Sequence, residues 1–537
     1  MVINMKNRLI FSVLSAVILI TALTGCAAYD KIKNEIKSIF MFDENTEEAA
    51  PVPEEGKMSN TIAVGMYDFD TFNPLTTKSQ TVHEAMEFIY EPLFTINDQI
   101  LPEPQLAKDY GISADGKTIT INLRDDVQWH DGTGFSAYDV AYTMKQIKNG
   151  ETTYTENLKD MADYKVTGNY QLTVKFDHPI STSAALFTFP IVKSKTDMDA
   201  GKGYAPIGTG PFAYSGKIST DRYMLNAFDY YYGGRAKLDG VYIDECPDAE
   251  HYIYMYSSGA FDAATSTTVD LSTYTPKGSV VLNEYLSNNL IFIGINNAVS
   301  QFKGANTRIA MSELIDREGI VSSVLYSRAV AVDIPVNPRF KFYSGKTDDF
   351  SINEHLVLEH IKNDGWTDDG GVYAKYVNGQ YRMLAADILV NKDNAEKKAI
   401  AEKISNDFAK YGIKTYVSAL PYEQYIERIN AGQYDLFIGE YSLPITQDNS
   451  GFIGGGNNLF NYKNDTMDAL MTQIGMTSNE EELKSLYDLF MQTFKAEAPI
   501  IPIAYAKEYM LSSPVLKDIQ APGVSGCYKN SSIWKIK

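Results

Sequence analysis

Apolar and polar residues alternate with a period of two over residues 117–129, KTITINLRDDVQW. Ile119, Ile121 and Leu123 fall on one side of this pattern, which predicts a strand with one buried face. The segment GISADGKT just before it has the spacing of a phosphate-binding loop, but such a loop lies between a strand and a helix. The upstream PEPQLAKDY predicts no strand, and a strand rather than a helix comes after the segment. We therefore interpret Asp115-Gly116 as a hairpin turn and expect no nucleotide site.

Longer segments carry apolar residues at a period of 3.6 and predict amphipathic helices. Residues 136–150 form one, with Ser136 as its cap and an apolar stripe of Val140, Met144 and Ile147. A second covers 394–414, and a third covers the tail segment 479–498, before the strand-like PIIPIAYA.

The region around the second helix alternates helices and strands. After 394–414 come the strand YVSAL, the helix PYEQYIERINAG and the buried strand YDLFIGEY. This order predicts an α/β unit with a largely parallel sheet.

The N-terminal region, 1–58, differs from the rest of the chain. Lys6 and Arg8 precede the apolar run 9–23, which is too short for a comfortable membrane span and predicts a signal peptide over 1–25. Its end, LTGC, resembles a bacterial lipobox, which implies lipidation of Cys26; the alternative is a plain signal peptide with an accidental cysteine. The acidic, proline-containing segment 26–58 predicts a flexible tether.

Composition narrows the class of protein. The 537 residues suit two or three domains, and the net charge of −20 argues against nucleic acid as a partner. Cys246 and Cys527 could pair outside the cytoplasm or stay free and buried.

We find no nucleophile elbow and no zinc-binding helix, since HLVLEH has the wrong order and spacing. We therefore expect no enzyme, no cofactor and no resident metal.

One segment carries a family resemblance. LRDDVQWHDGTGFSAYDVAYTMKQI (123–147) resembles the signature of family 5 extracellular solute-binding proteins, with Gly134 in place of a proline. Further segments resemble the family in the expected order. The matching signature positions are Leu123, Arg124, Val127, Trp129, Asp131, Gly132, Phe135, Ala137, Asp139 and Val140, and the further segments are FNPLTT and IYEPLF (within 72–94), 207–212, 308–325 and 431–441.

The resemblance implies an α/β, two-lobed periplasmic-binding-protein fold of type II, cluster C, with an extra α+β subdomain inserted in lobe I. It implies strand crossings between the lobes near 292–297 and 499–505. The implied ranges are 59–96, 201–295 and 505–537 for lobe I, 97–200 for the extra subdomain and 296–504 for lobe II.

The resemblance also implies a function. Such a protein captures a peptide or other small solute as its lobes close and delivers it to an ABC permease with its ATPase subunits. We expect a monomeric lipoprotein on the outer face of the cytoplasmic membrane. A surface receptor for signalling on the same fold and a secreted hydrolase stay open as alternatives.

Candidate ligand contacts follow from the same resemblance. Oligopeptide binders of the family have a G-W-x-x-D segment whose acid pairs with the peptide amine. Here it is GEYSL, so Glu440 replaces the tryptophan and Leu443 replaces the acid. Glu440 could meet a cationic group, or Asp448 could restore the missing acid. The full candidate set is Phe72, Tyr154, Glu440, Tyr441, Asp448 and Tyr505.

Overall fold

The computed structural model describes residues 60–537, except for residues 181, 199, 267–279, 378, 457, 478, 521–522 and 525. The predicted signal peptide, Cys26 and the tether over 26–58 lie outside the described residues, so these expectations stay predictions. Residues 58–537 form one compact unit, which contains all of the elements below.

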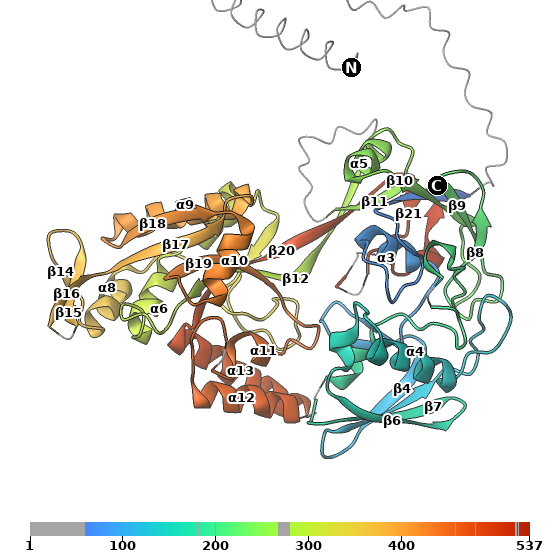
Figure 1. The fold of residues 1–537 in the computed structure, drawn as a ribbon, viewed down its shortest axis with the longest axis horizontal. Helices are drawn as coiled ribbons and strands as arrows, with labels where there is room; N and C mark the ends of the chain where they lie inside the picture. The colour runs from blue at the N-terminus through green and yellow to red at the C-terminus, as the bar shows by residue number, and fades with distance from the viewer. Residues whose placement is uncertain are drawn as a thin grey trace, which may run out of the picture. The chain divides into compact units, whose positions relative to one another are not determined.

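One mixed sheet of 11 strands runs through the unit (Figure 1). We call one end of it lobe I, where β1 pairs in parallel with β10 and both faces of β1 are buried. Because each face is covered, the strand is a continuous apolar run rather than an alternating one. Lobe I contains β1 (Thr61–Tyr67), β8 (Phe212–Lys217), β9 (Arg222–Ala227), β10 (Gly240–Cys246), β11 (Ala263–Ser266), α3 (Gln80–Met86) and α5 (Ala249–Ser257).

Two long strands connect lobe I to the other end of the sheet, as Figure 1 shows. They are β12 (Val281–Ile295) and β20 (Ile500–Ser512), which pair in antiparallel. Their ladder is interrupted between Leu286 and Leu290, and the side chain of Ser287 donates to the carbonyl of Ala506 at 2.8 Å inside this interruption. A ladder with missing main-chain bonds bends more easily than a complete one, so this is the natural place for a hinge.

The other end of the sheet, lobe II, contains the predicted α/β unit. Strand β17 pairs in parallel with both β18 and β19, and helices cover both faces. The full sheet order is β18-β17-β19-β12-β20-β11-β1-β10-β9-β8, with β13 beside β20. The strands of lobe II are β13 (Ala329–Ala331), β17 (Ala385–Asn391), β18 (Lys414–Leu420) and β19 (Leu436–Ser442), and a separate small sheet holds β14 (Thr367–Asp368), β15 (Tyr373–Val377) and β16 (Gln380–Met383).

The helices of lobe II form two layers. Helices α6 to α9 pack in one core against the sheet, and α10 to α13 pack in the other. The predicted helices 394–414 and 479–498 are confirmed to within a few residues, and Gly412 has the left-handed backbone that ends the first. The bounds are α6 (Ala305–Glu313), α7 (Arg317–Ser323), α8 (Glu354–Asn363), α9 (Ala395–Lys410), α10 (Tyr422–Asn430), α11 (Ser450–Ile453), α12 (Asp465–Met476) and α13 (Glu480–Glu497).

The extra subdomain is an antiparallel four-stranded sheet in the order β4-β5-β7-β6, with one helix, α4, packed on it. Ser136 is the N-cap residue of α4, as predicted, and the side chain of Asp139 accepts hydrogen bonds from its backbone N and its hydroxyl. Its elements are β3 (Pro102–Pro104), β4 (Ala107–Ile112), β5 (Thr118–Leu123), α4 (Ala137–Asn149), η1 (Thr155–Leu158), β6 (Met161–Gly168), β7 (Gln171–Phe176) and η2 (Ser183–Phe187), and β2 (Phe94–Ile96) and η3 (Gly201–Gly203) lie on either side of it in the chain, within the lobe I ranges.

The predicted hairpin turn is confirmed: Gly116 adopts a positive φ of 67° between β4 and β5. The prediction that PEPQLAKDY contains no strand was wrong, because β3 and most of β4 lie in it. Strand β4 is an edge strand whose residues 108–111 are exposed, so main-chain pairing with β5 holds it and the sequence shows no apolar alternation.

The C-terminal segment returns to lobe I. It contains β21 (Leu516–Lys517), η4 (Ser531–Ile533) and β22 (Lys535–Ile536). Cys246 and Cys527 are buried free thiols, so the structure contains no disulfide between them and agrees with the alternative of two free cysteines.

Candidate functional site

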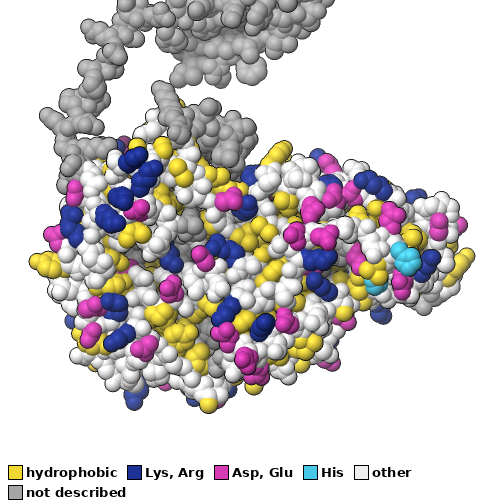
Figure 2. Space-filling view, turned by 180° about the vertical axis from the view of Figure 1, so that it is seen from behind, with side chains coloured by type: hydrophobic (Ala, Val, Ile, Leu, Met, Phe, Trp, Pro, Cys, Tyr) yellow, Lys and Arg dark blue, Asp and Glu magenta, His cyan; other side chains and the backbone are white. Residues whose placement is uncertain are grey.

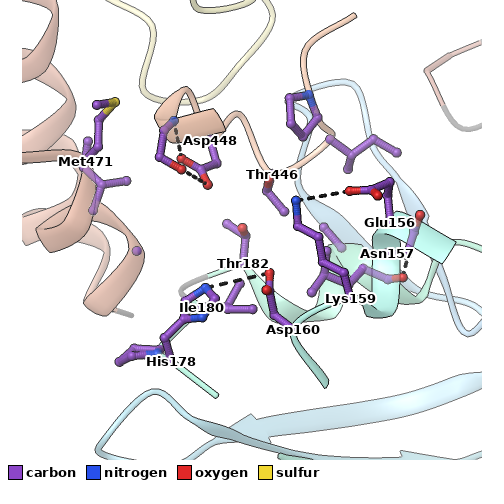
Figure 3. Close-up of a pocket in the computed structure, with 18 of the residues that line it drawn as sticks. Glu156, Asn157, Lys159, Asp160, His178, Ile180, Thr182, Thr446, Asp448 and Met471 are labelled. Carbon is purple, nitrogen blue, oxygen red and sulfur yellow. Dashed lines mark hydrogen bonds and ion pairs between the residues drawn. The ribbon is translucent and has the colours of Figure 1, made fainter. Parts of the chain in front are cut away.

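A cavity of about 720 Å³ lies between the extra subdomain and lobe II. Figure 3 shows that its two walls come from different parts of the chain: η1 with the loop after β7 on one side, and the segment after β19 with α12 on the other. A site built between two bodies changes shape when they move, which suits reversible capture of a ligand. The lining residues are Glu156, Asn157, Lys159, Asp160, His178, Pro179, Ile180, Thr182, Ala185, Leu186, Tyr441, Ser442, Pro444, Ile445, Thr446, Asp448, Ser450, Met471, Thr472, Ile474, Gly475, Met476 and Tyr487.

The wall from the extra subdomain carries most of the charged groups (Figure 3). Lys159 Nζ lies 3.1 Å from Glu156 Oε2, and His178 Nε2 lies 3.9 Å from Asp160 Oδ2. The hydrogen bond to Glu156 raises the pKa of Lys159, and the charges of Asp160 and Asp448 add to this effect. Since Asp448 belongs to lobe II, this wall and the opposite one are electrostatically coupled across the cavity.

The wall from lobe II combines a carboxylate with an aromatic surface. Asp448 accepts hydrogen bonds from the backbone N and the hydroxyl of Ser450, at 2.8 and 2.7 Å. The ring of Tyr441 stacks on Phe452 with a centroid distance of 4.0 Å and an interplanar angle of 2°. A carboxylate beside a rigid aromatic face is suited to a cationic or amine-bearing ligand group.

Five of the six predicted site residues differ in how they lie relative to the cavity. Tyr441 and Asp448 both line the cavity, and Tyr154 is the residue just before η1, which forms part of its wall. Phe72 and Tyr505 are 2 % and 0 % exposed and lie in the cores of lobe I and lobe II, outside the cavity lining. Their proposed contacts with ligand stay predictions.

Glu440 has a partner within the protein. Lys397 Nζ donates to Glu440 Oε2 at 2.7 Å, and the two side chains are 19 % and 38 % exposed. Leu443, where relatives are expected to have an acid, is buried in the lobe II core. Asp448 is therefore the acidic residue of this segment that lines the cavity.

Sequence reasoning missed the extra subdomain's contribution to the cavity. Lys159, Asp160 and Thr182 belong to no motif, and His178 has no metal-binding spacing around it. Only the packing of η1 and the loop after β7 against lobe II brings them to one place, and no local pattern in the sequence signals that packing.

A second cavity, of about 760 Å³, is more open and lies where the signature segment meets residues 193–207. It is lined by Trp129, Asp139, Lys193 and Tyr204, among others, and no residue of lobe II contributes to it. Lobe closure would therefore not enclose a ligand there, and we take the cavity between the two bodies as the candidate site.

Several classes of site lack support within the described part of the chain. No group of three or more His, Cys, Asp and Glu side chains there could hold a metal ion. Among the same residues, no helix combines the length and apolar character required to cross a bilayer. On the face that Figure 2 shows, Lys and Arg are interspersed with Asp and Glu rather than forming one continuous basic surface.

Comparison with known proteins gives one consistent result. The model of bacterial extracellular solute-binding proteins, family 5 (middle region), matches residues 102–459. Heme-binding protein A of Haemophilus influenzae is 24 % identical over 464 residues, covering 78 % of this chain and 82 % of that protein. Oligopeptide-binding protein AppA of Bacillus subtilis is 24 % identical over 491 residues, covering 87 % and 89 %. The structure of HbpA2 from Haemophilus parasuis superposes with a TM-score of 0.73 at 19 % identity, covering 87 % of this chain and 98 % of that one.

Proposed function

The chain belongs to the bacterial extracellular solute-binding proteins of family 5, and from this premise we propose that it captures a peptide or other small solute between its two lobes. The single observation that carries the proposal is the cavity of about 720 Å³, whose walls come from lobe II and from the extra subdomain. The similar proteins are named as binding proteins, and on this ground we propose that this protein is a binding protein rather than an enzyme.

Asp448 is the proposed anchor for a cationic or amine group of the solute. It lies in the cavity lining, while Glu440 already has Lys397 as its partner. Removing the charge of Asp448 should weaken an amine-bearing solute about ten- to a hundredfold, because a hydrogen bond to a charged group contributes roughly 1.5 to 3 kcal/mol.

The experiment begins with mass spectrometry of any small molecule retained by the purified protein. Calorimetry then compares Asp448→Asn, Glu440→Gln and the control Asp465→Asn, an exposed acid at the start of α12. We expect a large loss only in Asp448→Asn. A loss only in Glu440→Gln would move the anchor to Glu440, and turnover of the solute instead of stoichiometric binding would overturn the proposal.

Closure is proposed to occur by bending of β12 and β20 at the interruption between Leu286 and Leu290. Small-angle scattering with and without the retained solute should show compaction. Identical profiles at saturating solute would count against closure. On the same basis we propose the domain boundaries. Lobe I comprises 59–96, 201–295 and 505–537, the extra subdomain comprises 97–200, and lobe II comprises 296–504.

Delivery and anchoring complete the proposal. We propose that the monomeric protein presents its closed form to an ABC permease with its ATPase subunits, and that a lipid on Cys26 holds it at the outer face of the cytoplasmic membrane. Cys26→Ala should release the protein from membranes; unchanged retention and no lipid mass on the mature N-terminus would contradict the anchor. The alternative is a surface receptor for signalling, which would bind the same solute but would not deliver it to a permease.

A further inference from the structure

We propose that the cleft has a second recognition site next to the hinge, a cluster of three carboxylates that binds an ammonium or guanidinium group of the captured solute. The inference rests on the proposed function, because it assigns the chemical class of the solute. We call Glu84, Glu87 and Glu508 the hinge acid cluster. Glu84 lies on α3 of lobe I, Glu87 follows the last residue of α3, and Glu508 lies on the hinge strand β20.

Two of the carboxylates are held by neutral donors. Glu84 accepts hydrogen bonds from the hydroxyl of Thr265 on β11 and from Gln80 Nε2, the latter at 3.1 Å. Glu508 accepts from the hydroxyl of Tyr285 on β12 and, at 3.4 Å, from Asn289 Nδ2. Their oxygens are therefore positioned by neutral groups, and no ion pair within the described part of the chain balances their negative charges.

Glu87 is held by the C-terminal segment. Its carboxylate accepts from the backbone N of Cys527 at 3.2 Å and from that of Tyr528 at 2.7 Å. Cys527 Sγ also lies 3.4 Å from the hydroxyl of Tyr285, so the thiol connects Glu87 with the pair of Tyr285 and Glu508. Burial raises the pKa of Cys527 well above its ordinary value, so it stays an uncharged thiol at neutral pH.

The cluster forms no ion pair among the described residues. Of the basic groups near it, Lys507 pairs with Glu284 at 3.0 Å, and Lys529 Nζ donates to the carbonyl of Ile96 at 3.0 Å while its charge acts on Glu87 without forming an ion pair with it. Burial lowers the pKa of His83 on α3, which leaves that imidazole uncharged at pH 7. On the side of lobe II, Glu440 adds a negative charge near Glu508, although Lys397 is its partner.

Carboxylates without a cation in a low-dielectric region resist ionisation. Burial raises the pKa of Glu84 to about 7 and that of Glu87 to about 8, and it also raises the pKa of Glu508. The neighbouring carboxylates act in the same direction, since Glu508 raises the pKa of Glu84 and Glu84 raises that of Glu87, whereas the positive charge of Lys529 lowers the pKa of Glu87. A bound cation would reverse these shifts, so binding it must release protons.

An independent observation indicates that a polar group is missing here. The hydroxyl of Tyr528 is buried and has no hydrogen-bond partner among the described residues, although the side chain is only 1 % exposed. The charges of Glu84 and Glu87 act on this hydroxyl, as does the phenol of Tyr252. Buried hydroxyls normally have a partner, and a polar ligand group beside the cluster would supply one.

Tyr154 connects the cluster with the cavity. Burial raises its pKa, and the charge of Glu87 adds to that effect. Its ring packs edge-on against His83, with 5.9 Å between centroids, while Glu156 and Asn157 two and three residues later line the cavity. In this proposal one elongated solute contacts both Asp448 and the cluster. Glu508 is only half-buried, so the cationic group would meet it first.

The test uses calorimetry on the purified full chain with three tripeptides: Ala-Lys-Ala, Ala-norleucine-Ala and Ala-Glu-Ala. They share the terminal amine, so only the central side chain differs. We expect the lysine peptide to bind at least tenfold more tightly than the norleucine peptide, and this ratio to rise between pH 6 and pH 8.5. Proton release should appear as a binding enthalpy that depends on the ionisation enthalpy of the buffer.

Substitutions in the chain test which residues cause the preference for the lysine peptide. Glu508→Gln should reduce the preference for lysine about tenfold, while Glu284→Gln, which changes an acid paired with Lys507 on the adjacent strand, should leave it unchanged. Should Glu508→Gln not fold, Tyr528→Phe removes only the unpartnered hydroxyl and should also reduce the preference. Equal binding of the lysine and norleucine peptides would overturn this inference alone. Failure of all three peptides to bind would overturn both peptide capture and the cluster.

Discussion

Acidic residues near the hinge and acidic residues of lobe II have the same functional group and opposite surroundings. In lobe II, Glu440 has a lysine 2.7 Å away and Asp448 has two donors from Ser450 at the cavity surface. In the hinge acid cluster, Glu84 is 6 % exposed and has only neutral donors. Position in the fold, rather than residue type, therefore decides whether a carboxylate is an ordinary surface charge or a proton-binding group.

The largest expected effect is on the pH dependence of stability. The pKa of Glu84 is raised from 4.5 to about 7 in the folded state, so its stabilising contribution is complete below pH 4.5 and is lost as the pH rises through 7. The loss amounts to about 3 kcal/mol. Glu84→Gln should remove this part of the pH dependence, measured by urea unfolding at pH 5 and pH 8. Parallel pH profiles for variant and parent would show that Glu84 is ionised like a surface acid.

Tyr285→Phe should have the next largest effect. The substitution removes the hydroxyl that donates to Glu508 and contacts Cys527, and it leaves a half-buried carboxylate short of a donor. We expect a loss of about 1 to 3 kcal/mol in the free energy of unfolding. Tyr254→Phe is the matched control, because that ring is 67 % exposed and should change stability by less than about 0.5 kcal/mol. Equal effects of the two substitutions would refute the importance of this hydrogen bond.

Tyr528→Phe should act in the opposite direction in the solute-free protein. A buried hydroxyl without an acceptor is a cost to the folded state, so its removal should stabilise the protein by about 1 kcal/mol. Thermal unfolding without solute measures this, and the gain should shrink when Ala-Lys-Ala is present. A destabilised variant would mean that the hydroxyl has an acceptor already.

Glu440→Gln should have the smallest effect. Its partner Lys397 is 19 % exposed and Glu440 is 38 % exposed, and ion pairs this close to solvent contribute about 0 to 1 kcal/mol. Unfolding at low and at high NaCl concentration should show that the small difference from the parent protein decreases with salt. A large loss of stability that does not change with salt would place Glu440 in the same class as Glu84.

Elements with a strong internal pattern could be predicted from the sequence. The helix Ala395–Lys410 was predicted within a few residues because its apolar positions repeat at the helical period, and the strand Leu436–Ser442 was predicted because a short continuous apolar run indicates a buried strand. Strand β4 escaped prediction because an edge strand needs only main-chain pairing. Signature residues around Trp129 and Asp131 indicated the family.

The candidate site could be predicted only in part. Tyr441 and Asp448 were accessible through the resemblance, whereas the partner of Glu440 is Lys397, on a different element. The hinge acid cluster combines α3, which ends at Met86, with β20, which begins at Ile500, and no spacing in the sequence announces that contact. Long-range packing, which no local pattern encodes, determines which charges meet.

The arrangement of β20 also determines when the protein can finish folding. This strand lies between β12 and β11, so it joins the two ends of the sheet, yet it begins only at Ile500. A ribosome synthesises the chain from the N-terminus, so β1 to β12 are all made long before the strand that connects β11 with β12. Closing the long loop between β12 and β20 is also entropically unfavourable and slow. The nascent chain must therefore stay incompletely folded until β20 has been synthesised, which keeps it longer in a state that chaperones can engage.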